Sequence, residues 1–173
     1  SLVTGSTARV AFGRYASPNY QDAQRVIPDL PSRTGEPVAH GTHDITFVLF
    51  VPAGPMPPRG WPVAIFGHGY SDTNVQAAWG WGSVLPSMGV AVIGINAVGH
   101  GGGPLTHIDV TTRDGRTAAV AGNGRSVAMT GLPGTADGNF SRYGGFNAVG
   151  RHSLIDIRDG VRQTVVDLMQ LTR

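Results

Sequence analysis

The segment WPVAIFGHGYSDTN, residues 61–74, has residue types that could do chemistry at the end of a strand. The apolar run 63–66 stops at Gly67, His68 and Gly69. Glycines let a backbone turn sharply and come close to a ligand. Backbone N–H groups at such a turn, near a helix N-terminus, can face a negative charge. The corner is therefore suited to an anion or a developing oxyanion, and the alternative is that the glycines only make a tight strand-to-helix turn.

Two further groups of side chains have the residue types of a metal site, namely His40, His43 and Asp44, and His100, His107 and Asp109. Neither group has the second half of a structural zinc motif, so loop histidines in turns are the alternative, and we expect no metal. Acidic and amide side chains in a Gly-rich segment could hold Ca²⁺, although EF-hand spacing is absent; these are Asp109, Asp114, Asn123 and Asp137. We expect no cofactor.

Composition limits the class of protein. A chain of 173 residues is long enough for one domain with a core. The net charge of +2, without a Lys/Arg cluster, argues against nucleic acid. No apolar run has membrane-spanning length. Cysteine is absent, which excludes disulfides and leaves the compartment open. Because the first residue is Ser1, we expect a processed, trimmed or excerpted chain whose targeting segment could already be gone. The location is left unknown, with secreted or periplasmic favoured.

Strands and a helical crossover should position the corner. Residues 44–51 and 90–96 are predicted strands, and 63–66 is typical of a strand buried on both faces of a parallel sheet. Residues 73–88 are predicted to be helical, which completes a right-handed βαβ unit. The side chains expected to face inward from that helix are Trp79, Leu85 and Met88. Residues 1–43 contain four prolines and are predicted as loops with one short strand near 8–12.

The second half of the chain has two contrasting parts. Residues 99–150 are Gly-rich and predict a long surface excursion, which is either a lid over the site or decoration. Residues 151–173 predict an amphipathic helix with a capping box at Ser153 and Asp156. The apolar stripe that we expect to lie on the sheet consists of Leu154, Ile157, Val161, Val165 and Leu168.

The order of these features resembles the amino-terminal half of the α/β-hydrolase superfamily, and GWPVAIFGHG is similar to bacterial lipases and esterases. The resemblance implies an α/β fold with a mostly parallel sheet and flanking helices. It implies that the residue after the His-Gly corner, Tyr70, donates its backbone N–H to an oxyanion hole. The supporting loop residues would be Gly67, His68, Gly69 and Ser71. Residues 96–101, NAVGHG, match the superfamily's turn after the fourth strand in part, with Asn96 in place of Asp and Val98 in place of Arg. Trp79 and Trp81 could line an acyl pocket or pack the helix on the sheet.

The nucleophile of that superfamily lies in a Gly-x-Ser-x-Gly turn that is followed by an acid and a His. The sequence contains no such motif, and the nearest segment, GRSVA at 124–128, follows no apolar strand. The resemblance therefore implies that the nucleophile, acid and base are not in this chain. In the superfamily the third strand lies between the fourth and the fifth, so 63–66 would be left as an open apolar edge. We expect a second polypeptide to cover it, namely the carboxyl-terminal fragment of the same precursor after a cut at Arg173.

The resulting hypothesis is a serine-type carboxylic-ester hydrolase of the lipase or esterase kind, active once the missing part completes it. Its substrate would be a small-molecule or polymer ester. The alternative is a non-catalytic hydrolase-like module that binds a partner. The expected organisation is one incomplete domain over 1–173, with an extension at 1–43, a strand and helix core at 44–98, the excursion at 99–150 and the helix at 151–173.

Overall fold

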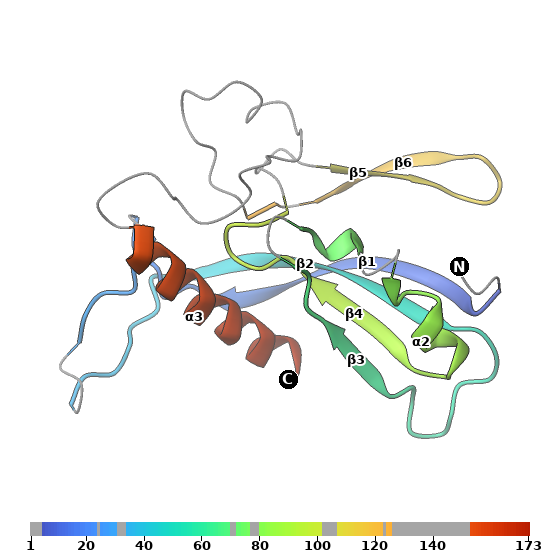
Figure 1. The fold of residues 1–173 in the computed structure, drawn as a ribbon, viewed down its shortest axis with the longest axis horizontal. Helices are drawn as coiled ribbons and strands as arrows, with labels where there is room; N and C mark the ends of the chain where they lie inside the picture. The colour runs from blue at the N-terminus through green and yellow to red at the C-terminus, as the bar shows by residue number, and fades with distance from the viewer. Residues whose placement is uncertain are drawn as a thin grey trace.

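The structure is a computed structural model that describes residues 5–23, 25–30, 34–69, 72–76, 80–101, 107–122, 124–125 and 153–173. A four-stranded sheet has the order β1-β2-β4-β3, and a separate two-stranded hairpin lies beside it (Figure 1). The sheet strands are β1 Thr7–Pro18, β2 Thr42–Pro52, β3 Val63–Phe66 and β4 Ala91–Ile95. The other elements are the 3-10 turn η1 Asn74–Gln76, helix α2 Val84–Ser87, hairpin strands β5 His107–Thr111 and β6 Thr117–Ala121, and helix α3 Ser153–Leu171.

The expectation of a mostly parallel α/β sheet with flanking helices is wrong. Among the described strands, β3 and β4 are the parallel pair, whereas β1 with β2, β2 with β4 and β5 with β6 are antiparallel. The described residues contain two α-helices, and one of them has four residues. The physical reason is the long ladder between β1 and β2, which runs from Thr7↔Pro52 to Pro18↔Thr42 and adds an antiparallel half to the sheet.

Strand β1 has twelve residues where a loop with one short strand was expected. Its sequence lacks a continuous apolar run, and Gly13 breaks the alternation. Gly13 pairs with Phe47 of β2, and a Cβ atom at Gly13 would overlap the Phe47 ring. The glycine is thus the space that the aromatic ring occupies, a packing role that glycines in strands often have.

The core of the sheet lies on the face that carries alternate residues of β2 and β4. Val48, Phe50 and Val92 are buried, and Phe12, Phe66 and Leu85 pack against them. Successive side chains of a strand point to opposite faces, so the register Phe50↔Val92 brings these side chains together. Leu85 of α2 therefore faces inward as predicted.

Strand β3 pairs with β4 and forms one edge of the described sheet, as expected from the strand order that the resemblance implied. Its predicted burial on both faces is wrong, because Val63 is 58% exposed and Ile65 is 44% exposed. Among the described residues, β3 is therefore unpaired along one edge, and Val63 and Ile65 are exposed on one face.

The crossover from β3 to β4 is not the predicted long helix. It contains η1 and the short α2, and Met88, expected to face inward, is 72% exposed. Gly80, Gly82 and Pro86 lower helix propensity across this segment. Trp79 lies outside the described residues.

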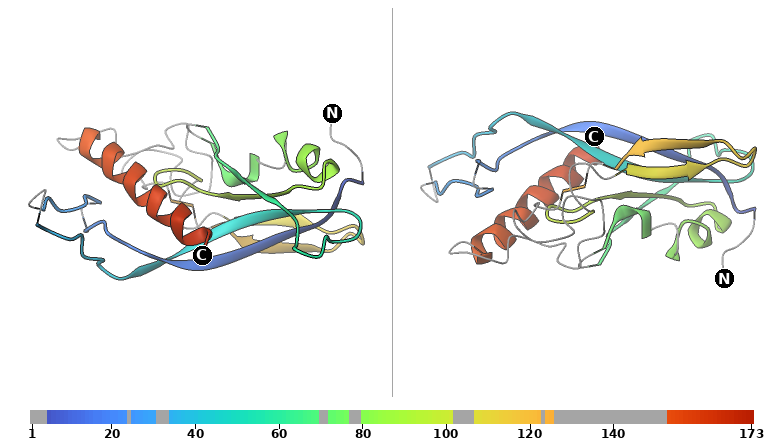
Figure 2. Two further views of the ribbon diagram at one scale, coloured as in Figure 1. Left: turned by 90° about the horizontal axis from the view of Figure 1, so that it is seen from below. Right: turned by 90° about the horizontal axis from the view of Figure 1, so that it is seen from above.

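Helix α3 is present as predicted, and it lies across one end of the sheet (Figures 1 and 2). For three of the five residues in the predicted stripe its orientation is the reverse of the prediction, and Leu168 is partly buried. Ile157, Val161 and Val165 are 38%, 52% and 49% exposed, whereas Asp159 and Gln163 are fully buried. The side chains of Ser153, Leu154 and Asp156 are outside the described set. None of the described helices combines the length and apolarity needed to cross a bilayer.

Candidate functional site

The corner after β3 is tied to the turn after β4 through His68. The backbone N–H of Ala97 donates to His68 Nε2 at 3.0 Å, so Nε2 must be unprotonated. The other ring nitrogen, Nδ1, lies 2.8 Å from the carbonyl oxygen of Gly69 and donates to it. These two contacts select the neutral tautomer that carries its proton on Nδ1.

The electrostatic surroundings agree with this tautomer. Burial lowers the pKa of His68, because the charged ring is poorly solvated there. The ring of His100 is 5.0 Å away between centroids, and His100 itself is buried with Nδ1 3.0 Å from the Val98 carbonyl. A proton on Nε2 of His68 would also face the Ala97 N–H. His68 is therefore a hydrogen-bonding link between two loops.

Asn96 holds the turn after β4 against the crossover. Its Oδ1 accepts the Asn74 backbone N–H at 2.8 Å, and the side chain is 3% exposed. Gly101 has φ of +82°, and a Cβ atom there would overlap the Asn96 amide. The residue that stands where the superfamily's turn usually has Asp is thus a buried structural amide in this chain.

Other sequence-predicted site residues are placed as follows. A Cβ atom added to Gly67 would meet nothing within 4 Å, and one added to Gly69 would be 3.8 Å from Asp72 Oδ2, so the corner has open space beside it. Trp81 is 49% exposed. Tyr70, Ser71 and Trp79 lie outside the described residues, so the structure does not place the expected N–H donor or one of the two tryptophans.

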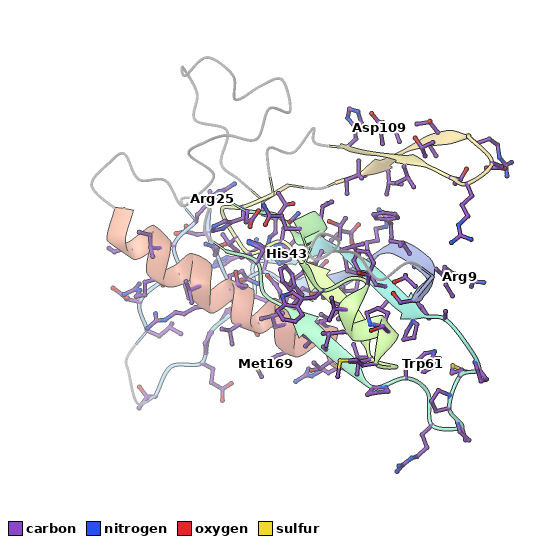
Figure 3. All side chains as sticks on the ribbon, turned by 45° about the vertical axis from the view of Figure 1, so that its right-hand side comes forward. Arg9, Arg25, His43, Trp61, Asp109 and Met169 are labelled. Carbon is purple, nitrogen blue, oxygen red and sulfur yellow. The ribbon has the colours of Figure 1, made fainter. Side chains whose placement is uncertain are left out.

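A buried polar cluster around Asp167 was not predicted. The carboxylate of Asp167 is fully buried, and its Oδ1 accepts hydrogen bonds from Ser17 Oγ at 2.7 Å and Gln163 Nε2 at 2.9 Å. His43 Nε2 lies 3.1 Å from the same oxygen. The Tyr15 hydroxyl donates to the Asp167 carbonyl at 2.8 Å. Figure 3 shows His43 near the middle of the molecule, beside α3.

Arg125 joins this cluster to the turn after β4. Its Nη2 lies 2.7 Å from Asp167 Oδ2, and its Nη1 donates to the Asn96 carbonyl at 3.0 Å. Its backbone also pairs with Gly99 and His100. Burial raises the pKa of the Asp167 carboxyl, but the hydrogen bond from His43, the charge of Arg125 and the other donors outweigh burial and hold that pKa below its usual value. Burial and the nearby Asp167 charge raise the pKa of Tyr15.

The Asp167 cluster contains a Ser, a His and an Asp, yet it is not arranged as a nucleophilic triad. A triad needs the histidine between the serine and the carboxylate. Here Ser17 and His43 both bond the same carboxylate oxygen, and Ser17 is fully buried. The cluster instead fastens α3 to the ends of β1 and β2. Its signal in the sequence was the spacing of Asp159, Gln163 and Asp167 at intervals of four, which place three polar groups on one side of a helix.

The candidate metal ligands do not come together. His107 Nε2 is 3.7 Å from Asp109 Oδ1 on the exposed hairpin, and His43 contacts Asp167. Within the part of the chain that the structure describes, no three His, Asp or Glu side chains converge on a point. Asn123 and Asp137, two of the Ca²⁺ candidates, and Ser126 of the GRSVA segment lie outside the described residues.

Comparisons with known proteins find no match to this chain among family models, curated proteins or solved structures.

Proposed function

We propose that this chain is the oxyanion-hole part of a serine-type carboxylic-ester hydrolase. The observation that supports the proposal most directly is the Ala97 N–H to His68 Nε2 bond, which joins the carboxyl ends of two neighbouring parallel strands. Because β3 and β4 are parallel, the loops that follow them meet at the same end of this mixed sheet. The open space beside Gly67 lies on the same corner.

In the proposed mechanism the Tyr70 N–H and the N–H after the nucleophile donate to the tetrahedral oxyanion. A serine of a second polypeptide attacks the ester carbonyl carbon, and a carboxylate-held His accepts the serine proton. His68 is a positioning residue, because its Nδ1–H fixes the carbonyl of Gly69. A peptide unit is planar, so fixing this carbonyl fixes the plane to which the proposed donor N–H belongs.

The second polypeptide is proposed from the surfaces that this chain leaves open. Strand β3 has β4 on one side, and Val63 and Ile65 are exposed on its face. An exposed apolar edge strand is a site for pairing with another chain. The outward stripe of α3 is a second apolar surface that a partner would cover. We propose the carboxyl-terminal fragment of the same precursor as that partner, carrying the nucleophile, the acid and the His.

The test is labelling of the protein as purified. It should hydrolyse a short p-nitrophenyl ester, and a serine-reactive organophosphonate should abolish that activity. Peptide mass spectrometry should then locate the phosphonate adduct on a serine of the second polypeptide. An adduct on Ser17 or another serine of this chain would overturn the proposed division of labour. A protein inert to both reagents would favour the alternative of a non-catalytic hydrolase-like module.

A pair of variants tests the donor itself. Tyr70→Pro removes the backbone N–H and should lower kcat by about 100-fold to 1,000-fold, the usual effect of losing one oxyanion-hole donor. Tyr70→Phe keeps the N–H and should leave kcat nearly unchanged. Near-normal kcat in Tyr70→Pro would exclude the role.

A further inference from the structure

A groove lies between α3 and the loop that joins β1 to β2, and it is separate from the corner after β3. Its volume is about 460 Å³, which is within the range of small-molecule sites. Its apolar lining comes mainly from Tyr20, Ile27, Pro37, Val166 and Met169. Met169 lies near the carboxyl end of α3 (Figure 3), and Figure 2 shows the loop running past this helix.

The apolar lining continues beyond the groove along the same loop. A smaller hollow of about 140 Å³ shares Tyr20, Ile27 and Pro37 with the groove and extends to Leu30 and Val38. Leu30 is 39% exposed and Val38 is 72% exposed. Because three residues line both hollows, the hollows lie next to each other along the loop, and a ligand with a flexible chain suits such a row of apolar side chains better than a compact ring.

Positive charge lines the α3 side of the groove. The side chains of Arg162 and Arg173 both line it, and neither Asp nor Glu is among its described lining residues. The neighbouring acid, Asp159, is fully buried and turned toward other donors. Its oxygens accept Arg158 Nε at 2.7 Å, Arg158 Nη2 at 3.0 Å and the Ile27 N–H at 2.9 Å.

Arg162 is therefore only weakly engaged by Asp159. Its Nη1 is 3.4 Å from Asp159 Oδ1, the longest contact of that group, and its side chain is 58% exposed. A guanidinium has five N–H donors in a planar fork that matches a carboxylate. Arg162 thus has donors to offer a ligand in the groove.

We propose that this groove binds an alkyl monocarboxylate, with the carboxylate on Arg162 beside Arg173 and the alkyl chain on the apolar path past Tyr20 and Ile27. The inference does not depend on the proposed ester hydrolysis, because none of the described residues of the β3 corner, 67–69, lines the groove. An alkyl chain gains affinity by burying CH₂ groups, so the dissociation constant should fall by up to about fourfold for each CH₂ added until the path is full.

The experiment is isothermal titration of the purified protein, in whatever complex it is isolated, with octanoate and decanoate. Decanol and decyltrimethylammonium are the neutral and cationic probes of matched chain length. Arg162→Gln removes the proposed carboxylate partner, and Arg116→Gln, on the 85% exposed Arg116 of the hairpin, is its matched control. Met169→Glu places a like charge in the groove, and Met169→Leu keeps its shape.

Decanoate should bind more tightly than octanoate, decanol and decyltrimethylammonium. Arg162→Gln should weaken decanoate binding about fivefold while leaving decanol unchanged, and Met169→Glu should weaken it by about tenfold or more. Arg116→Gln and Met169→Leu should stay within about twofold of the parent. Ester hydrolysis by Arg162→Gln should equal that of the parent.

Three results would each overturn the proposal. They are no decanoate binding below about 1 mM, decanol or the cationic probe binding as tightly as decanoate, and equal affinities for Arg162→Gln and Arg116→Gln. If the protein binds decanoate but lacks esterase activity, the proposed ligand site is supported and only the proposed hydrolase function is rejected.

Discussion

The sheet core and the contact between α3 and the sheet are built from opposite kinds of residue. In the core, Val48, Phe50 and Val92 are buried against other apolar side chains. We call the contact between α3 and the sheet the α3 seam and define it by Ser17, Gln163 and Asp167. These three side chains are polar and fully buried. The core is held by non-directional apolar burial, whereas the seam is held by hydrogen bonds and an ion pair with fixed geometry.

This difference shows that the polar side chains of α3 determine which side of the helix faces the sheet. Asp159 and Gln163 bond the loop after β1 through the Ile27 and Tyr20 N–H groups. Because those polar groups face the body of the protein, the apolar stripe through Val161 and Val165 faces outward. A buried polar group that loses its hydrogen-bond partner destabilises the protein. Substitutions or pH changes that remove a hydrogen bond should therefore lower the stability of the seam and leave the apolar core unaffected.

The largest expected effect breaks the core. Phe50→Ala removes a large buried side chain and should lower the free energy of unfolding by about 3–5 kcal/mol. The loss should appear as an earlier midpoint in urea, followed by circular dichroism, for strands and helix together. Val10→Ala, at a position that is 43% exposed on β1, is the control and should cost much less. Equal losses in the two variants would contradict the assigned core.

The second prediction breaks the seam. Asp167→Ala leaves the Arg125 guanidinium, only 12% exposed, without its carboxylate and should cost about 3 kcal/mol. Hydrogen exchange should speed up in α3 before it does in β2 and β4, since the lost contacts belong to the helix. Asp44→Ala breaks the exposed Arg14–Asp44 pair and should cost less than about 1 kcal/mol. Uniform loss of protection across the sheet and α3 would show that the seam and the core unfold as one unit.

The comparison also explains which features the sequence predicts. Strands β3 and β4 are continuous apolar runs and were found with nearly correct bounds. Only the part of β1 near 8–12 was predicted, because Gly13 interrupts the strand and its register depends on Phe47, more than thirty residues away. The 3.6-residue period predicted helix α3, but periodicity shows only that two faces differ and not which face is buried.

Some parts of the candidate site could be predicted from the sequence and others could not. The corner at Gly67 and His68 could be found because its residues are contiguous and follow an apolar run. The link from His68 to Ala97 and the cluster around Asp167 could not, because their members come from distant segments such as Ser17 and Arg125. Contacts between residues that are far apart in the sequence produce no local spacing pattern from which they could be predicted.

The third prediction uses pH to separate the corner from the seam. The pKa of His68 is lowered by burial, so its stabilising contribution is complete above about pH 6.5, the ordinary histidine value, and is lost as pH falls below it. The pKa of Asp167 is also lowered, so its contribution lasts until about pH 4 and disappears below that. Hydrogen exchange followed from pH 7 to pH 3 should loosen the β4 turn first and α3 second. The reverse order would contradict these ionisation states.

The last prediction compares a polar and an apolar residue of α3. Replacing the polar residue should destabilise the protein more than replacing the apolar one, which is the reverse of the usual ranking. Gln163→Ala removes an amide that bonds the Tyr20 N–H, the Pro18 carbonyl and Asp167, and it should cost about 1–3 kcal/mol. Val165→Ala, at a 49% exposed position, should change the free energy of unfolding by less than about 0.5 kcal/mol. Urea unfolding of both variants of the 173-residue chain measures the difference.

The same pair also tests the proposed second polypeptide. If the proposed partner covers the outward stripe of α3, Val165→Ala should cost more in the complex than it does in the chain alone. Gln163→Ala should cost the same in both, since its contacts lie within this chain. If Val165 costs more than Gln163 even in the chain alone, α3 does not hold its polar side toward the sheet. A Val165 effect that is equally small in both forms would place the partner elsewhere, so that β3 alone would remain as its docking edge.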